Sequence, residues 1–368
     1  MPGGESCSPI KIVDSAGSPR QAKWLRWLLE TRFVGMGETK TMSDKQKVAF
    51  GLTLPNRGVI TGATTVAEML EMAEWADSAG WDSVWVGDSI FAKPRLDAIA
   101  LLGALAARTR RVRLGPACFA STPLRDPLIL AYQWACLDFM SGGRTIFVAC
   151  KGQPEVGGGN FEQEFATLRV DPKSRVRRME EVIEIMRLTS SRESVSYDGK
   201  YARFRDLTIL PRPVQQPLPI WVTANPRLPH DFPSAFRRVA KLGDGWMTTG
   251  GTPDTLRQQV AMIRGYAREL GRDLPANFEV CVYYNINVNE DREAALAESK
   301  RFLDVYYTTD YPRDFLEAWV AMGSPAQCIE NIRGFVDAGA TTITLRLTGY
   351  DQKKQFKRVT EEVLPALA

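Results

Sequence analysis

Short apolar strands alternate with amphipathic helices along this chain, and this alternation constrains its fold most. Residues 82–86 form an uninterrupted run of apolar and small residues, which is typical of a strand buried on both faces. The stretch before it, 66–79, carries apolar residues at helical spacing and ends at Gly80. After it, 96–109 is again helical, and a new strand, 111–117, follows at once. Strands and helices that alternate in this way predict a parallel sheet covered by helices.

The same alternation continues to the end of the chain. The predicted strands cover residues 48–54, 82–86, 111–117, 144–150, 220–223, 243–248, 278–288 and 341–347. The later helices are predicted at 126–139, 173–188, 234–242, 253–270, 291–307, 325–338 and 352–364. Eight strands without an internal repeat or linker favour an α/β fold, a single (β/α)8 TIM barrel with insertions, over a doubly wound sheet. The insertions are an irregular Gly-rich stretch at 154–172 and a hairpin with its turn at 198–199.

Residues 1–45 differ from the rest and are predicted to be a partly disordered N-terminal extension to one domain at 46–368. They are rich in Gly, Ser, Pro and Lys, and Met42 would serve as an alternative translation start. The alternative is a lid or dimer arm that docks through Trp24 and Trp27.

Composition limits the classes of partner. The 368 residues include 47 basic and 43 acidic side chains, a net charge of +4 that is too small to indicate binding of nucleic acid or an anionic membrane. No apolar run reaches the roughly 20 residues that span a bilayer, and the first residues do not resemble a signal peptide. The six cysteines have no CxxC spacing, so we expect reduced thiols in a cytoplasmic protein and no metal site.

Polar residues follow the predicted strands at their carboxyl ends, where the active sites of α/β barrels lie. These residues are Asn56 and Arg57, Asp88 and Ser89, Lys151, Gly152 and Gln153, Ala224 and Asn225, and Thr248, Thr249 and Gly250. Asp88 has a structural alternative, which is to fix its turn. Lys151 would meet an anionic group or be a solvated strand end. The only histidine, His230, lies in the same region and is more simply explained as an incidental surface residue.

Two predicted strands place polar side chains inside the barrel. Tyr283 and Asn285 lie opposite the apolar stripe of strand 278–288, and Arg346 lies near the end of strand 341–347. An arginine inside a barrel requires an anion or a carboxylate as its partner. The partner is either a bound substrate or an internal acid.

Together these segments resemble the bacterial luciferase-like monooxygenase family of flavin-dependent and F420-dependent oxidoreductases, over residues 48–365. The motifs that carry the resemblance are FGLTLP (50–55), AGWDSVWVGD (79–88), AARTRRVRLG (106–115), DPL (126–128), LDFMSGGR (137–144), YDGKY (197–201), PRPVQ (211–215), PIWV (219–222) and AKLGDGW (240–246). The resemblance implies a TIM barrel that holds FMN or the deazaflavin F420 at the carboxyl ends of its strands.

The resemblance also implies roles for individual residues. Asp88, Ser89 and Gln153 take the catalytic positions, although many members carry His where this chain has Ser89. Sugar-phosphate dehydrogenases of the F420 branch carry an acid where it has Gln153. Neither side chain transfers a proton near neutral pH, which argues against that activity. The cofactor would be held by Asn56, Lys151, Gly152, Ala224, Asn225, Thr248, Thr249 and Gly250, and the substrate by Arg57, Tyr283, Asn285 and Arg346.

The predicted function is a luciferase-like monooxygenase that uses reduced FMN and oxygen on a small organic substrate. A separate flavin reductase would supply the reduced flavin, because no GxGxxG motif follows a strand. The alternatives are F420-dependent hydride transfer and a non-catalytic flavin-binding protein. The resemblance further implies a homodimer.

Overall fold

Eight parallel strands close into a barrel, which confirms the predicted (β/α)8 fold. The computed structural model describes residues 47–152, 158–226, 231–249, 251–275 and 277–367. The strands are β1 (Ala49–Thr53), β2 (Ser83–Val86), β3 (Arg113–Pro116), β4 (Phe147–Ala149), β7 (Ile220–Thr223), β8 (Gly245–Thr248), β9 (Glu279–Val288) and β11 (Thr342–Leu347). They pair in the order β3-β2-β1-β11-β9-β8-β7-β4. Backbone hydrogen bonds from Ile146 N to Leu114 O (2.9 Å) and from Phe119 N to Val148 O (3.0 Å) then join β4 to β3.

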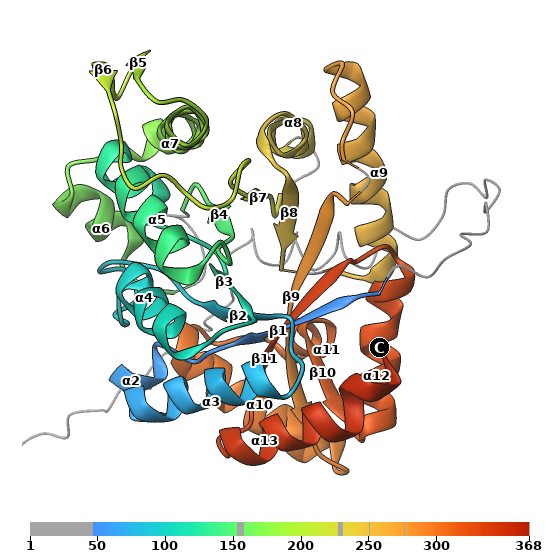
Figure 1. Ribbon diagram of the computed structural model, residues 1–368. Helices are drawn as coiled ribbons and strands as arrows, with labels where there is room; N and C mark the ends of the chain where they lie inside the picture. Colours follow the sequence, from blue (N-terminus) through green and yellow to red (C-terminus); the bar gives the residue numbers. More distant parts are fainter. Residues whose placement is uncertain (1–46, 153–157, 227–230, 250, 276, 368) are drawn as a thin grey trace, which may run out of the picture. The chain divides into compact units, whose positions relative to one another are not determined.

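Helices surround the strands as an outer layer (Figure 1). They are α2 (Gly58–Thr61), α3 (Val66–Ser78), α4 (Ala98–Arg108), α5 (Pro127–Ser141), α6 (Phe161–Thr167), α7 (Arg175–Ser191), α8 (Phe232–Leu242), α9 (Pro253–Glu269), α10 (Arg292–Tyr307), α11 (Arg313–Trp319), α12 (Pro325–Asp337) and α13 (Gln352–Arg358). A π-helical turn, Val359–Val363, continues α13, and 3-10 turns lie at Thr122–Leu124, Pro172–Ser174 and Leu364–Ala366.

Local sequence explains where these helices begin and end. The carboxylates of Asp97 and Asp126 each accept two backbone N–H groups at the starts of α4 and α5. Thr65 and Glu68 form a capping box at the start of α3. Gly142 ends α5 with φ 70°, a conformation that glycine adopts without steric cost.

Two tryptophans fill the barrel interior, and glycines on neighbouring strands leave room for them. Trp85 and Trp221 are buried, with ring centroids 5.4 Å apart. A Cβ atom at Gly51 would lie 2.7 Å from Cδ1 of Trp85, and one at Gly245 would lie 2.6 Å from Cδ1 of Trp221. Because large and small residues alternate around the ring in this way, the interior is a packed core below the mouth of the barrel.

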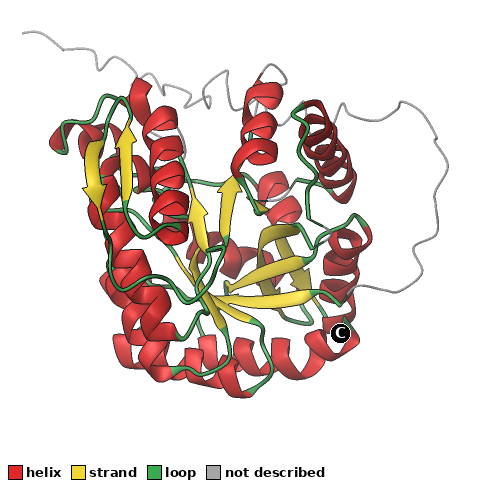
Figure 2. Cartoon of the chain, turned by 45° about the horizontal axis from the view of Figure 1, so that its top comes forward, coloured by secondary structure: helices red, strands yellow, loops and turns green. Residues whose placement is uncertain are grey.

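A hairpin, a helix and a short strand lie outside the regular alternation. The predicted hairpin is present as β5 (Val195–Asp198) and β6 (Arg203–Leu207), and Figure 2 shows it apart from the barrel strands. The stretch 154–172, predicted to be irregular, contains α6, whose Phe165 is buried. A short strand, β10 (Val320–Gly323), was not predicted. It pairs with the second half of β9, beyond the last residue of β8 that pairs with β9.

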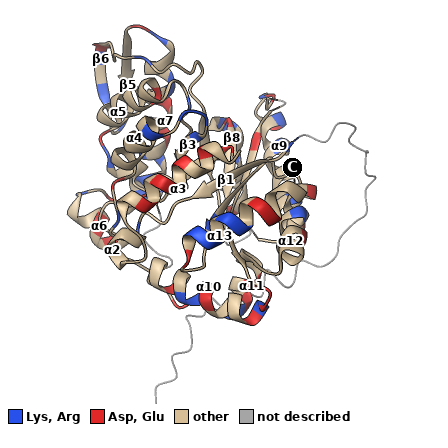
Figure 3. Cartoon of the chain, turned by 60° about the horizontal axis from the view of Figure 1, so that its bottom comes forward, with Lys and Arg blue, Asp and Glu red and all other residues tan. Residues whose placement is uncertain are grey.

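Charged side chains of both signs (Figure 3) and free thiols are present among the described residues. Basic and acidic side chains are interspersed on the helices that Figure 3 turns forward. None of the helices in the described residues is long and apolar enough to cross a membrane. The described cysteines, Cys118, Cys136, Cys150, Cys281 and Cys328, are free thiols. No group of three or more His, Cys, Asp or Glu side chains in the described ranges could hold a metal ion.

Candidate active site

The carboxyl ends of the eight strands form one end of the barrel, and the predicted site residues that the structure describes follow these strands or lie within them. Gln153, Gly250 and His230 lie outside the described residues. The roles predicted for these three residues therefore remain predictions.

Asn56 joins the ends of β1 and β2. Its Nδ2 donates to the carbonyl of Gly87 (2.8 Å) and its Oδ1 accepts the N–H of Gly87 (3.0 Å), while the hydroxyl of Tyr306 donates to Oδ1 (3.2 Å). Because the side chain is buried and both of its ends are engaged, these contacts favour a structural role over direct cofactor binding.

Asp88 and Ser89 are buried after β2, and both make contacts that fix neighbouring loops. Oδ2 of Asp88 accepts the backbone N–H of Ser121 (2.7 Å), and its Oδ1 lies 3.7 Å from Arg125 without a hydrogen bond. Burial raises the pKa of Asp88, although Arg125 and the Ser121 N–H oppose the shift. The Ser89 hydroxyl donates to the carbonyl of Lys93 (2.7 Å) and accepts from Nε of Arg95 (3.1 Å). The Ser89 hydroxyl is thus already used within its own loop.

The predicted substrate residues of β9 and β11 meet inside the mouth. Arg346 and Asn285 are partners in the parallel register of these strands. Nε of Arg346 donates to the hydroxyl of Tyr283, which also shares a 2.8 Å hydrogen bond with the hydroxyl of Tyr307. The Arg346 guanidinium lies 4.0 Å from the ring centroid of Tyr306. The sequence leaves open whether the partner of Arg346 is an internal acid. Among the described residues, the neighbours of the guanidinium are the phenol rings of Tyr283, Tyr306 and Tyr307.

Two further cations, Lys93 and Arg95, join this group from the loop after β2. The Arg95 guanidinium covers Gly87, where a Cβ atom would collide with it. Burial, with Arg95 and Arg57 as like charges nearby, lowers the pKa of Lys93 to about 7. The Lys93 ammonium lies 5.0 Å from the ring centroid of Tyr307. Burial raises the pKa of Tyr306, but Arg346 and Arg95 outweigh burial and lower it.

We call Arg57, Lys93, Arg95, Arg346, Tyr283, Tyr306 and Tyr307 the basic–tyrosine cluster. Sequence analysis missed four of its members, Lys93, Arg95, Tyr306 and Tyr307. The two cations lie in a loop beyond the predicted strand end, and the two tyrosines end helix α10. The signal that was available was two residues, Tyr283 and Arg346, on strands already predicted to line the mouth, since such side chains require a complementary wall.

A second basic group lies at the end of β4. Lys151 is half-buried, and burial together with Arg175 and Arg238 lowers its pKa. Gly152 follows with φ 68°, and a Cβ atom there would lie 3.1 Å from the carbonyl of Ala120. Glycine adopts this backbone conformation without strain, and a side chain here would crowd the Ala120 carbonyl.

The ends of β7 and β8 are tied together by Asn225. Its Oδ1 accepts the Thr248 hydroxyl (2.8 Å) and the backbone N–H of Thr249 (2.9 Å). Ala224 is buried, and its carbonyl accepts the indole N–H of Trp246 (3.0 Å). Thr248 and Thr249 thus lie at the rim as predicted, in a turn that the Asn225 side chain holds.

Two thiols contact each other between β3 and β4. A hydrogen bond between Cys118 and Cys150 raises the pKa of Cys118 and lowers that of Cys150 to about 7. The Asp88 carboxylate also raises the pKa of Cys118. Composition had indicated reduced thiols but had not placed these two beside a predicted site residue.

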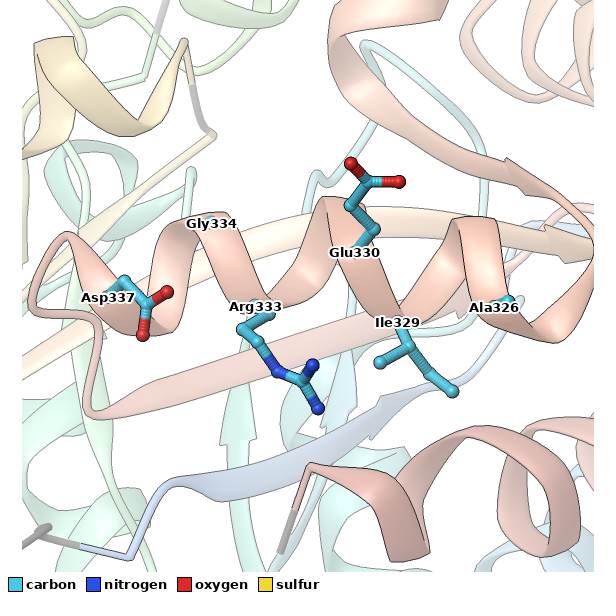
Figure 4. Close-up of a pocket in the computed structure, with 6 residues that line it drawn as sticks. All are labelled: Ala326, Ile329, Glu330, Arg333, Gly334 and Asp337. Carbon is cyan, nitrogen blue, oxygen red and sulfur yellow. The ribbon is translucent and has the colours of Figure 1, made fainter.

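The resemblance implies a cofactor site at the carboxyl ends of the strands, and two residues of the predicted site, Gln153 and Gly250, lie outside the described residues. A described depression of about 420 Å³ lies elsewhere, along the outer helix α12. Figure 4 shows its lining, which comes from this one helix and includes Glu330, Arg333 and Asp337. Its position away from the strand ends separates it from the candidate active site.

Comparisons with known proteins place the chain in a family. The sequence profile described as "luciferase-like monooxygenase" matches residues 48–342. An F420-dependent glucose-6-phosphate dehydrogenase of Kineococcus radiotolerans is 24% identical over 327 residues, covering 82% of this chain and 93% of that protein. The enzyme of the same description from Beutenbergia cavernae is 28% identical over 329 residues, with coverage of 82% and 93%.

Solved structures share the fold. The monooxygenase RslO1 from Streptomyces bottropensis aligns with a TM-score of 0.71 at 24% identity, over 87% of this chain and 100% of that one. An F420-dependent secondary alcohol dehydrogenase in complex with an F420-acetone adduct aligns with a TM-score of 0.74 at 19% identity, over 88% and 99%. With the profile match over most of its length, the chain belongs to the luciferase-like monooxygenase family and is an oxidoreductase of that family.

Proposed function

We propose that this protein is an F420-dependent oxidoreductase that transfers a hydride between the deazaflavin and a small organic substrate at the mouth of the barrel. The basic group at the end of β4 supports a cofactor with an anionic side chain, which both F420 and FMN have. The two F420-dependent glucose-6-phosphate dehydrogenases named above support F420 over FMN, since they align over 82% of this chain and 93% of their own length.

The residues at the rim fit such a cofactor. Lys151 and Arg175 lie close enough for their charges to interact, and Nε of Arg175 is buried without a hydrogen-bond partner among the described residues. Gly152 and the turn at Thr248 and Thr249, which the Asn225 side chain holds, lie at the same end of the barrel, near the start of α9. When bound, the deazaflavin would accept or donate the hydride, and these residues would hold and orient it.

Hydride transfer from an alcohol also requires a group that takes up a proton. Ser89 and Gln153 do not ionise near neutral pH. Lys93 changes charge near pH 7, within the basic–tyrosine cluster and in the loop that Ser89 fixes. We therefore assign the uptake of this proton to Nζ of the neutral Lys93 amino group, in place of the imidazole that many family members carry.

The second candidate is the FMN-dependent monooxygenase predicted from the sequence. It is supported by the family description and by the fold shared with RslO1. This candidate requires a separate flavin reductase as partner. A homodimer is proposed for either candidate, and light scattering of the purified chain would measure it.

Cofactor titration tests the proposal. The tryptophan fluorescence of the full chain would be followed as F420 or FMN is added, and turnover with candidate alcohols would be followed at the absorbance of F420. We expect F420 to bind at least about tenfold more tightly than FMN, a difference of roughly 1.4 kcal/mol. Preferential binding of FMN, with oxygen consumption on addition of reduced FMN and substrate, would instead establish the monooxygenase.

A further inference from the structure

We propose that the basic–tyrosine cluster binds the carboxylate of the substrate, so that the substrate class is an organic acid with an apolar or aromatic body. This inference rests on the proposed function for its catalytic meaning. The binding itself depends only on the residues of this chain.

Buried polar atoms without partners mark the place where the ligand would bind. Among the described residues, Nη1 of Arg346, Oδ1 of Asn285 and Nε1 of Trp319 are buried and have no hydrogen-bond partner. The three residues are neighbours, because Arg346 pairs with Asn285 in register and Nδ2 of Asn285 donates to the carbonyl of Trp319 (3.1 Å). Buried polar groups in folded proteins are normally satisfied, so the two unpartnered donors, Nη1 of Arg346 and Nε1 of Trp319, indicate that a bound acceptor would lie beside them.

The charge of the cluster specifies an anion. Arg346 is 1% exposed and Arg57 is 7% exposed, and neither forms an ion pair with a carboxylate of the described residues. Nε of Arg57 is likewise buried without a partner there. Asp88, the carboxylate that acts on Arg95, is already held by Ser121 and Arg125. Two buried guanidinium groups without a counter-charge are costly, and a bound anion would remove that cost.

The walls of the site favour a carboxylate on an apolar body over a phosphate. The Arg346 guanidinium lies within 6.0 Å of the ring centroids of Tyr283, Tyr306 and Tyr307. Beyond them the aromatic contacts continue, since Trp319 lies 6.0 Å from Tyr283 and 5.7 Å from Tyr307. Aromatic walls suit an anion that carries an apolar or aromatic body, which inorganic phosphate lacks, and the unpartnered Nη1 of Arg346 would donate to the carboxylate of such a ligand.

Binding of benzoate to the cofactor-free full chain tests the inference. Isothermal titration would compare benzoate with its neutral analogue benzamide and with inorganic phosphate. We expect benzoate to bind at least about tenfold more tightly than either, because only it combines a planar anion with an apolar body. Equal affinity for benzamide would overturn the anion site, and tighter binding of phosphate would overturn the carboxylate class.

Variants locate the binding site. We expect Arg346→Gln to weaken benzoate binding by about tenfold or more, and Tyr283→Phe, which keeps the ring and removes the partner of Nε, to weaken it by a smaller factor. Arg144→Gln is the matched control. Arg144 is a partly buried arginine at the other end of the barrel, where it donates to the carbonyls of Val112 (2.8 Å) and Ala106 (3.0 Å). Benzoate affinity that is unchanged in both Arg346→Gln and Tyr283→Phe would overturn the assignment, and Tyr283→Phe retains the test if Arg346→Gln does not fold.

Failure of the carboxylate site can be told apart from failure of the proposed F420 dependence. Cofactor affinity would be measured on the same variants, and we expect Arg346→Gln to retain F420 binding within about twofold because the basic group of Lys151 is elsewhere in the barrel. Failure of F420 to bind with intact benzoate binding would refute the cofactor alone. Failure of benzoate to bind with intact F420 binding would refute the carboxylate site alone.

Discussion

The amino group of Lys93 is largely buried near Arg57 and Arg95. Both its burial and these like charges oppose a positive charge on it. Its pKa is about 7 in the folded protein, against an ordinary value of 10.5. Between these values the unfolded chain binds more protons than the folded chain, so the free energy of unfolding rises with pH in this window. Below pH 7 the lysine is charged in both states, and the cost of burying the charge is fully present.

Replacement of Lys93 should therefore stabilise the protein in a pH-dependent manner. We expect Lys93→Met to raise the free energy of unfolding by about 1–3 kcal/mol at pH 6, with the gain shrinking as pH approaches 10. Urea unfolding of the wild type and the variant at pH 6 and pH 9 measures the difference. A gain that is the same at both pH values would contradict the assignment of this charge.

Lys151 lies near Arg175 and Arg238, which carry the same charge and repel it. An anionic cofactor side chain would relieve this repulsion. We expect Lys151→Gln to weaken the binding of F420 by about tenfold, and to leave unchanged the binding of the deazaflavin chromophore without its anionic side chain. Fluorescence titration with both compounds checks this, and an equal loss for the two would show that Lys151 acts on the ring instead.

At the scale of elements, the starts of α4 and α5 form a natural comparison. Asp97 and Asp126 each accept two backbone N–H groups, at 2.9–3.0 Å and 2.9 Å. Asp97 additionally accepts from Arg125 at 2.6 Å, whereas Asp126 has no ion pair among the described residues. Comparison of Asp97 with Asp126 thus separates the contribution of a helix cap to stability from that of an ion pair.

We expect Asp126→Ala to lower the free energy of unfolding by about 1 kcal/mol, the usual effect of losing a helix cap. Asp97→Ala should lower it by the same amount plus up to about 1 kcal/mol, since its ion pair is partly exposed. Chemical denaturation of both variants at low and high salt measures the two terms. An Asp97→Ala effect that does not exceed that of Asp126→Ala would mean that Arg125 contributes nothing here.

At the scale of the whole molecule, the barrel closes because glycines admit two tryptophans to its interior. A methyl group at Gly51 would lie 2.6 Å from Oγ of Ser83 and 2.7 Å from Cδ1 of Trp85. We expect Gly51→Ala to destabilise the protein by about 1–3 kcal/mol through overpacking. Gly103, within α4, has no neighbour within 4 Å of the corresponding position, so Gly103→Ala should instead stabilise the protein by about 0.5–1 kcal/mol.

Thermal unfolding of these two variants, with Trp85→Leu and the double variant Gly51→Ala/Trp85→Leu, tests this explanation. Trp85→Leu creates space, so the effect of Gly51→Ala should be smaller in that background. If Gly51→Ala were equally destabilising with and without Trp85, its effect would arise from something other than the packing of the barrel interior.

The sequence by itself determined the barrel. Strand 82–86 and its seven counterparts were located because buried parallel strands are apolar throughout and helices repeat their apolar residues every three to four positions. The strand β10 escaped notice because its four residues directly follow a helix, and it exists because β9 extends past the end of β8. Edge pairing of this kind depends on strand lengths elsewhere in the chain.

Only the tertiary structure decided how the strand ends combine into a site. The predictions that Arg346, Tyr283 and Asn285 point into the barrel followed from the period of two along a strand. The convergence of Lys93, Arg95, Tyr306 and Tyr307 on them could not be predicted, because those four residues reach the mouth from a loop and a helix end. Period and composition fix which face of an element is buried, whereas the meeting of side chains from residues 57 to 346 depends on the closure of the whole barrel.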